Sequence, residues 1–267
     1  MSKAKVEIIY QDDDVIVINK PAGVSVTKDR TGAFQLVDIL ARKLGPKITG
    51  ELRLVHRLDK DTSGVMILAK NKETQSKFSS YFEKALIKKT YLALVTGAIP
   101  AQQGTINASL ARNRKNPVLM CVTAKKGKEA VTDWRLLADF GTAKLLAVYP
   151  LTGRTHQIRV HLSSIGLPLA IDPLYGAKQP LFLSDFKPDY RLAKDKTETP
   201  LIERLTLHAY QIQLPALRLD CPEYFVASLD KKFAATVKML AKYNPEGLNS
   251  FLNPDIFSKI TNARRLD

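Results

Sequence analysis

One short segment of the chain combines ionisable side chains with turn-forming residues and then continues into an apolar run. The segment is His56-Arg57-Leu58-Asp59-Lys60-Asp61-Thr62-Ser63-Gly64, and the apolar run is Val65-Met66-Ile67-Leu68-Ala69. Five apolar residues after a cluster of turn formers are typical of a buried strand. Loops held by such strands often carry catalytic residues, so the carboxylate of Asp59 is a candidate nucleophile or base.

Two other interpretations of this segment need to be weighed. Asp59, Asp61 and Ser63 followed by Gly64 also match the first half of a calcium-binding loop. The twelfth position of that loop is Lys70, a cation where a bidentate glutamate is required, so the sequence argues against calcium. The remaining alternative is a polar turn in which Asp and Ser side chains accept hydrogen bonds from backbone amides.

A second polar segment, residues 153–161, contains two histidines and two arginines. His156 and His161 are five residues apart, so they point to opposite faces of a strand and miss the i, i+4 spacing that brings ligands together on a helix. No third cluster of ligands is visible, and we expect no metal site. If the segment is helical, Arg159 is placed above a neighbouring loop as a fixed cation.

Both segments resemble motifs of the RluA-type pseudouridine synthases, RNA-modifying enzymes that isomerise uridine in place. Further matches follow in the order of the family: Asn19-Lys20-Pro21-Ala22-Gly23, Lys89-Thr90-Tyr91-Leu92-Ala93 with Val95 and Gly97, residues 152–162, Asp172-Pro173-Leu174-Tyr175-Gly176, and Leu207-His208-Ala209. The resemblance runs from about Val6 to about Leu240. Several long matches in the right order make a chance resemblance improbable.

The sequence departs from the family pattern in two places. Many relatives have a small S4-like RNA-binding domain before the Lys-Pro-Ala-Gly segment, whereas here about five residues precede the first expected strand. We therefore expect the catalytic domain itself to grip the RNA. Ile171 stands before Asp172 where the family usually has glycine, and this change affects the expected geometry of that loop.

The resemblance implies roles for the residues of the candidate site. Asp59 corresponds to the catalytic aspartate and Arg159 to its ion-pair partner, while Tyr91 packs against the base and relays the proton that leaves C5. Without the resemblance, Tyr91 is an ordinary strand aromatic. Arg57 is placed to fill the space left by an extruded uridine or to bind a phosphate, and its alternative is a surface ion pair with Asp61.

The resemblance also places other motif residues beside the substrate: His56, Thr62, Arg154, His156, Gln157 and Ile158. The implied reaction cuts the N1–C1′ bond of uridine, turns the base and rejoins it through C5, and it needs no metal or cofactor. Asp59 could attack C1′, attack the base or remove the 2′ proton of the ribose, and the sequence does not choose among these routes. In each route its carboxylate has to stay charged in a closed pocket, which a neighbouring cation favours.

Charge is the main compositional indication of a partner. The 267 residues carry a formal net charge of +15 with a pI near 9.7, which suits a phosphate backbone and would also suit an acidic membrane surface. No cationic amphipathic helix or lipidation motif supports the membrane alternative. We therefore expect RNA, either rRNA or tRNA, as the partner, bound through basic residues that include Lys20, Arg112, Arg114, Lys115, Lys125 and Lys126.

Other features indicate an ordinary globular chain. No apolar run approaches 18 residues and the N-terminal segment leads into a strand, so we expect a cytoplasmic protein with no membrane span. Cys121 and Cys221 suggest no disulfide framework. We expect a monomer with a single catalytic domain over residues 1–267, with its core at about 6–243, a surface insertion at 177–200 and a C-terminal tail at 244–267.

The elements expected around the site give an α+β fold with a mixed, mainly antiparallel sheet flanked by helices. Hydrophobic patterns predict a hairpin around Asp12-Asp13-Asp14, a helix at 34–43 stopped by Gly45-Pro46, and a helix capped by Asn71 whose apolar face includes Thr74, Phe78, Tyr81, Phe82 and Leu86. They also predict a strand at 88–95, several strands between 104 and 160, a strand at 205–214 and a helix at 229–242.

Two other classes of function are compatible with a basic chain of this kind. An RNA-binding module that has lost activity would lack the acidic nucleophile, but Asp59 is present. A structural protein of a ribonucleoprotein particle would have long basic tails, and this sequence has none. The residues therefore favour an RNA-modifying enzyme.

Overall fold

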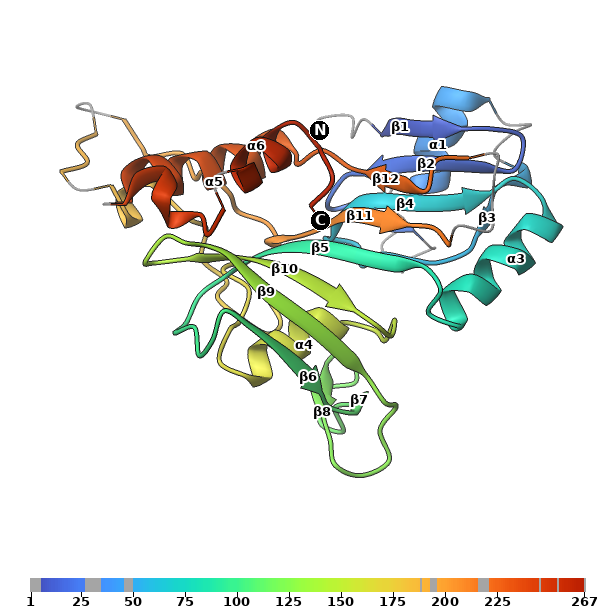
Figure 1. Cartoon of the computed structure of the whole chain (residues 1–267), viewed down its shortest axis with the longest axis horizontal. Helices are drawn as coiled ribbons and strands as arrows, with labels where there is room; N and C mark the ends of the chain where they lie inside the picture. The colour runs from blue at the N-terminus through green and yellow to red at the C-terminus, as the bar shows by residue number, and fades with distance from the viewer. Residues whose placement is uncertain are drawn as a thin grey trace.

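The computed structural model describes residues 6–26, 35–45, 50–187, 189–192, 196–215, 221–244, 246–253 and 255–266. Across these residues one 10-stranded sheet runs through the molecule, and a separate two-stranded sheet lies at one end (Figure 1). The main path is β1 (Glu7–Gln11), β2 (Val15–Lys20), β4 (Ser63–Ala69), β11 (Leu207–Gln213), β5 (Lys88–Val95), β10 (Lys144–Pro150), β9 (Val131–Asp139) and β6 (Gln103–Asn107). β12 (Tyr224–Val226) pairs with β11, and β3 (Arg53–Leu54) pairs with β4.

The sheet is mixed and mainly antiparallel. Only the β4–β11 pair is parallel among the strand pairs of the described chain. The two-stranded sheet consists of β7 (Leu110–Arg112) and β8 (Met120–Val122). The predicted α+β class is therefore confirmed.

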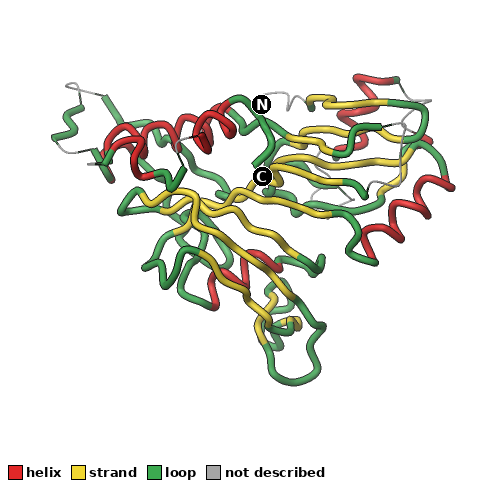
Figure 2. Tube along the Cα trace, viewed as in Figure 1, coloured by secondary structure: helices red, strands yellow, loops and turns green. Residues whose placement is uncertain are grey.

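Helices cover different parts of this sheet, as the red segments of Figure 2 show. α1 (Leu36–Leu44) and α3 (Lys72–Glu83) pack against β1, β2 and β4 through Leu36, Leu40 and Phe78. α5 (Lys231–Tyr243) and α6 (Asp255–Thr261) pack with Leu92 and Leu94 of β5, whereas α4 (Gln157–Ser164) packs with Ala93 and Val95. Because neighbouring residues of a strand point to opposite faces, α4 lies on the opposite face from α5 and α6.

Local sequence signals account for several of these elements. Asp12 Oδ1 accepts hydrogen bonds from the amides of Asp14 and Val15 at 2.8 and 2.7 Å, so the run of aspartates is a turn, as predicted. Asn71 caps α3 by accepting from Thr74 N at 2.8 Å, also as predicted. The helix expected at 34–43 is α1, but Phe34 and Pro46 lie outside the described residues.

Three predictions of local structure were wrong or incomplete. Leu86 was expected on the apolar face of α3, but the helix ends at Glu83 and Leu86 is 44% exposed. Strands were expected as far as Val160, yet α4 begins at Gln157. The tail after residue 244, for which no element was predicted, contains η2 (Gly247–Ser250) and α6, and Phe251 of this tail is buried against α5.

The segment expected as a surface insertion, residues 177–200, is largely irregular in its described parts. It contains one short turn of helix, η1 (Leu183–Asp185), and Leu181 forms a bridge with Ile202. Among the described residues, no helix combines the length and the apolar character needed to cross a membrane.

One row of residues across the sheet brings the polar loop before β4 next to β5. Lys20 on β2 pairs with Gly64 on β4, Gly64 pairs with Ala209 on β11, and Ala209 pairs with Tyr91 on β5. Gly64 has φ +118°, and a Cβ atom built there would lie 2.1 Å from Ala209 O. Only glycine therefore allows β11 to approach the start of β4, and this approach places the Asp59 loop beside Tyr91.

This close approach makes Gly64→Ala a test of the fold. Gly141 also has positive φ, +75°, but a Cβ atom added there would meet no other atom within 4 Å, so Gly141→Ala is the matched control. We expect Gly141→Ala to cost about 1–2 kcal/mol of unfolding free energy from backbone strain alone. Gly64→Ala adds a clash with backbone and should cost at least about 3 kcal/mol. Urea unfolding of both variants measures the difference. Equal losses of unfolding free energy would show that β11 shifts to accommodate the added methyl group.

Candidate active site

A cavity of about 560 Å³ opens where the Asp59 loop, β5 and the start of α4 meet. This volume is in the range of sites for small molecules and single nucleotides. Its lining includes all the residues that the sequence suggested for catalysis or substrate binding: His56, Arg57, Asp59, Thr62, Tyr91, Arg154, His156, Gln157, Ile158 and Arg159. The fold therefore brings segments about a hundred residues apart into one place.

Asp59 and Arg159 face each other in this cavity. Asp59 Oδ2 lies 3.4 Å from Arg159 Nη1, a long hydrogen bond within ion-pair range. The side chain of Asp59 is 24% exposed and that of Arg159 is 6% exposed. The carboxylate is consequently open to a ligand, while the cation behind it is buried.

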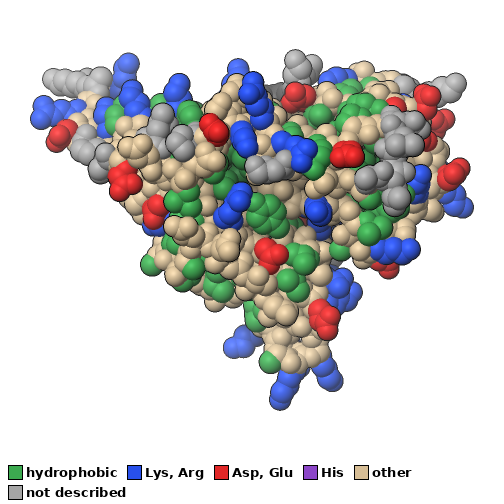
Figure 3. Space-filling view, in the orientation of Figure 1, with side chains coloured by type: hydrophobic (Ala, Val, Ile, Leu, Met, Phe, Trp, Pro, Cys, Tyr) green, Lys and Arg blue, Asp and Glu red, His purple; other side chains and the backbone are tan. Residues whose placement is uncertain are grey.

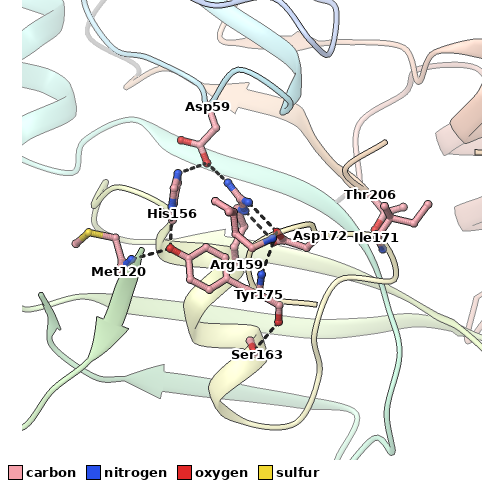
Figure 4. A network of polar contacts seen from close by, with 10 residues as sticks. Asp59, Met120, His156, Arg159, Ser163, Ile171, Asp172, Tyr175 and Thr206 are labelled. Carbon is pink, nitrogen blue, oxygen red and sulfur yellow. Dashed lines mark hydrogen bonds and ion pairs between the residues drawn. The ribbon is translucent and has the colours of Figure 1, made fainter. Parts of the chain in front are cut away.

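Asp172 holds the other edge of the Arg159 guanidinium (Figure 4). Arg159 Nε donates to Asp172 Oδ2 at 2.8 Å and Nη2 donates to Oδ1 at 2.7 Å. Oδ1 also accepts from the amides of Leu174 and Tyr175 at 2.9 and 3.2 Å. This bidentate pair fixes the plane of the guanidinium and leaves Nη1 for Asp59.

The charge of Arg159 is secured by the same contacts. Burial by itself lowers the pKa of Arg159, but its hydrogen bonds to Asp172, together with the charges of Asp172 and Asp59, raise the pKa overall. The sequence motif includes Asp172, but sequence reasoning did not assign this residue to the site. Its position directly before a Pro-x-Tyr-Gly turn was the available signal.

Ile171 does not disturb the Arg159–Asp172 pair, although the RluA-type family usually has glycine at this position. Its side chain is 1% exposed and packs in the core under α5. Its amide donates to Thr206 Oγ1 at 3.2 Å, and its carbonyl accepts from Thr206 N at 3.3 Å. Thr206 therefore fixes the backbone next to Asp172.

His156 is the second nitrogen group beside Asp59. It precedes α4 in the left-handed conformation, with φ 53°, and its Nε2 lies 3.9 Å from Asp59 Oδ2. Its Nδ1 lies 2.8 Å from the hydroxyl oxygen of Tyr175, which also accepts from Met120 N at 2.7 Å. Burial lowers the pKa of His156 although the charge of Asp59 opposes that shift, so we assign a neutral imidazole near pH 7.

Gln157 fixes α4 to the sheet. Its Oε1 accepts from Thr152 Oγ1 at 2.7 Å and from Arg154 N at 2.9 Å. Its Nε2 donates to Val131 O and Thr132 Oγ1, both at 2.9 Å. These four bonds use the whole hydrogen-bonding capacity of the amide, so its part in the site is to orient α4 and not to bind substrate through the amide.

The other predicted residues line the cavity in different ways. The amide of Thr62 donates to Asp59 O at 3.2 Å and so closes the turn that presents the aspartate. Ile158 is buried against the core, and Arg154 Nε donates to Glu129 O at 3.1 Å. Arg57 is exposed, and in the described part of the chain no ion pair joins it to Asp61.

Tyr91 reaches the cavity from β5. Burial raises the pKa of Tyr91, and the charge of Asp59 raises it further, so the phenol remains protonated at any physiological pH. Lys89, two residues earlier on the same strand, also lines the cavity, and its Nζ donates to Thr152 O at 3.2 Å. Burial lowers the pKa of Lys89 to about 8, and sequence reasoning did not assign this residue to the site.

Lys20 was expected on the RNA-binding surface, and that prediction was wrong. Its side chain is fully buried, and Nζ donates to the carbonyl oxygens of Pro21, Val24 and Lys60 at 3.0, 2.9 and 2.9 Å. Burial lowers the pKa of Lys20 to about 7, an effect opposed by the charges of Asp61 and Asp59. Through its hydrogen bond to Lys60 O, Lys20 supports the backbone of the Asp59 loop.

The other basic residues predicted for the RNA-binding surface lie at one end of the molecule. We name residues 110–122, which form β7, β8 and the turn between them, the basic hairpin. The exposed side chains on this hairpin and on the loop after it include the predicted cations Arg112, Arg114, Lys115, Lys125 and Lys126. Figure 3 shows Lys and Arg side chains projecting from the end of the molecule where β7 and β8 lie.

The structure gives no indication of a metal centre in the part that it describes. No group of three or more His, Cys, Asp or Glu side chains among the described residues is arranged to hold an ion. His161, five residues after His156, is directed elsewhere: its ring nitrogens lie 2.9 Å from Thr132 Oγ1 and 2.9 Å from Ala108 O.

Comparison with known proteins shows the family of the chain and agrees with its fold. A family model described as RNA pseudouridylate synthase matches residues 14–164, more than half of the chain. The ribosomal large subunit pseudouridine synthase D of Borreliella burgdorferi is 40% identical over 184 residues, which are 66% of this chain and 56% of that protein. An uncharacterized RNA pseudouridine synthase of Bacillus subtilis, YhcT, is 38% identical over 244 residues, which are 89% of this chain and 72% of that protein.

A solved structure gives the same result for the fold. Human RNA pseudouridylate synthase domain containing 1 superposes with a TM-score of 0.69 at 26% identity, covering 100% of this chain and 99% of that one. The chain belongs to the RNA pseudouridylate synthase family, in its RluA-type branch.

The environment of His56 leads to a prediction about pH. Its Nε2 accepts from Ile67 N at 3.0 Å, its ring stacks on Phe82 with centroids 4.3 Å apart, and burial, followed by the charge of Lys89, lowers its pKa to about 3. In the unfolded chain the pKa of His56 is near 6.5, so below that pH His56 binds a proton in the unfolded state but not in the native state. Stability present above pH 6.5 is therefore lost as the pH falls towards about 3.

We expect His56 to account for about 1–2 kcal/mol of the unfolding free energy lost between pH 7.5 and 5. His56→Gln keeps a hydrogen-bond acceptor for Ile67 N and removes the titrating group, so its stability should depend less on pH. Urea unfolding at several pH values compares the two proteins. Parallel pH curves for wild type and variant would contradict the assignment of a neutral His56.

Proposed function

We propose that this protein is a pseudouridine synthase that isomerises uridine in structured RNA, with Asp59 as the catalytic carboxylate. The chain spans 56% of the Borreliella relative, so this activity is inferred from the site as well as from the family. The observation that carries it is the pairing of a partly exposed Asp59 with a buried, doubly held Arg159 in one cavity. Such a pair keeps a reactive carboxylate ionised when a base enters and excludes water.

The reaction breaks the N1–C1′ bond, forms a C5–C1′ bond, gives a proton to N1 and removes one from C5. An ionised carboxylate serves each of the three possible first steps: attack on C1′, attack on the base, or removal of the 2′ proton. Arg159 holds Asp59 charged and oriented, and Asp172 keeps Arg159 in place. Asp59 is thus presented at one fixed position in the cavity.

Tyr91 has the position of a group that packs against the base. It lines the same cavity as Asp59, on the strand that Ala209 joins to Gly64. Its protonated hydroxyl can exchange a proton only through a neighbouring base, so we propose that it packs on the uracil ring and relays the C5 proton in concert with Asp59.

The substrate is proposed to be ribosomal RNA, because the relative from Borreliella is named for the large ribosomal subunit. A uridine has to leave its stack to enter this cavity, and extrusion costs a few kcal/mol. Arg57, exposed at the rim next to Asp59, is placed to fill the vacated space or bind a phosphate. The exposed cations of the basic hairpin supply attraction for the phosphate backbone.

The assignment of the nucleophile is tested with Asp59→Asn and Asp61→Asn. Asp61 is exposed and does not line the cavity, which makes it the matched control two residues away. Asp59→Asn removes the charge and should cost at least about 4 kcal/mol of barrier, on the order of a thousandfold in rate. Asp61→Asn should cost only a fraction of a kcal/mol. Single-turnover conversion of tritium-labelled uridine RNA at saturating enzyme measures both, and an active Asp59→Asn protein would falsify the assignment.

The role of Arg159 is tested with Arg159→Lys, which keeps the charge and loses the planar fork held by Asp172. We expect a loss of single-turnover rate of at least about a hundredfold with RNA affinity within about threefold of wild type. Alanine at Arg112, Arg114 and Lys115 should instead weaken binding and flatten its salt dependence. If Arg159→Lys behaves like these surface variants, Arg159 contacts phosphate and does not orient Asp59.

A further inference from the structure

A continuous chain of polar contacts joins the basic hairpin to Asp59 (Figure 4). The amide of Met120, on β8, donates to the hydroxyl oxygen of Tyr175 at 2.7 Å. That hydroxyl lies 2.8 Å from His156 Nδ1, and His156 Nε2 lies 3.9 Å from Asp59 Oδ2. The hairpin that carries exposed cations is therefore connected to the catalytic carboxylate through two side chains.

The donor at Met120 and the charge of Asp59 together favour one direction for this chain. Met120 N can only donate, so it uses one lone pair of the Tyr175 oxygen. If the Tyr175 hydroxyl donates a hydrogen bond to His156 Nδ1, the neutral imidazole carries its proton on Nε2, which faces the negative oxygen of Asp59. The opposite tautomer would turn an imidazole lone pair towards that carboxylate and is disfavoured. The charge of Asp59 thus favours the Nε2–H tautomer, and the Tyr175 hydroxyl supports this tautomer by donating to Nδ1.

Further contacts hold Tyr175 in place. Its amide donates to Asp172 Oδ1 at 3.2 Å and its carbonyl accepts from Ser163 Oγ at 3.0 Å. Its ring lies under the guanidinium of Arg159, 5.1 Å from Cζ to the ring centroid. The rings of Tyr175 and His156 meet edge to face, with an interplanar angle of 75° and centroids 5.5 Å apart.

We propose that Tyr175 is a positioning residue whose hydroxyl couples the basic hairpin to Asp59 through His156. Binding of the hairpin to RNA then sets the geometry of the catalytic carboxylate. This inference rests on the proposed function and assigns a path by which RNA binding at the hairpin affects the geometry of Asp59. RNA contacts far from the target uridine then influence the chemical step through one hydroxyl group.

The first test is a double-mutant cycle with Tyr175→Phe and His156→Asn. Phenylalanine keeps the ring under Arg159 and loses the hydroxyl, while asparagine tolerates the left-handed backbone at position 156. At saturating enzyme, Tyr175→Phe should lower the single-turnover rate about tenfold and leave the Kd for RNA within about twofold. In the His156→Asn background the same change should alter the rate less than about twofold. Rate losses that multiply in the double variant would show that Tyr175 does not act through His156.

The second test measures amide hydrogen exchange of a peptide covering the basic hairpin in the RNA-free protein. Tyr175→Phe should speed exchange of this peptide, because Met120 loses its acceptor. Tyr210→Phe is the matched control: the Tyr210 hydroxyl also has two partners, Lys259 O at 2.9 Å and Arg264 O at 2.6 Å, on the opposite face of the sheet. This control should lower overall stability and leave both hairpin exchange and the single-turnover rate at the wild-type level.

The two readouts separate the possible failures. A slower Tyr175→Phe enzyme with unchanged hairpin exchange overturns the link to the hairpin, and faster exchange with a wild-type rate overturns the link to Asp59. If wild-type protein converts no uridine in any RNA tested, the proposed function fails. In that case the exchange measurement still decides whether Tyr175 holds the hairpin.

Discussion

The buried ion pair between Arg159 and Asp172 is the contact on which the site depends. A guanidinium that is 6% exposed would be costly without a partner, and Asp172 supplies a bidentate one inside the protein. The cost of burying both charges is met by four hydrogen bonds to the carboxylate, two from Arg159 and two from backbone amides. The Nη1 group makes no bond to Asp172; its direction is fixed by this pair, and it is directed at Asp59.

The sheet supplies the other half of the arrangement. Gly64 lets β11 pass close to the start of β4, and the pairing of Ala209 with both Gly64 and Tyr91 sets the distance between the Asp59 loop and β5. α4 then lies on this face of the sheet because Gln157 bonds to β9 and to the loop before the helix. Strand register and one side-chain amide together bring Arg159 over Asp59.

The sequence was informative where the signal is local or carried by a family motif. Hairpin, caps and strand alternation follow from neighbouring residues, and Asp59, Tyr91 and Arg159 were found because their motifs are recognisable. Burial of Lys20 was not predictable, since a lysine in a loop motif is normally on the surface and the three carbonyl acceptors come together only in the fold. Leu86 was misplaced because apolar periodicity continues past the residue where the backbone leaves the helix.

The environments of three aspartates favour one of them for the proposed catalytic role. Asp172 is completely buried and accepts four hydrogen bonds from protein groups, so it is closed to a ligand. Asp61 is exposed and lies outside the lining of the cavity, where water screens its charge. Asp59 has an accessible carboxylate, a fixed cation on one side and a neutral imidazole on the other. Burial closes Asp172 to a ligand and Asp61 lies outside the cavity, so the proposed catalytic role falls to Asp59.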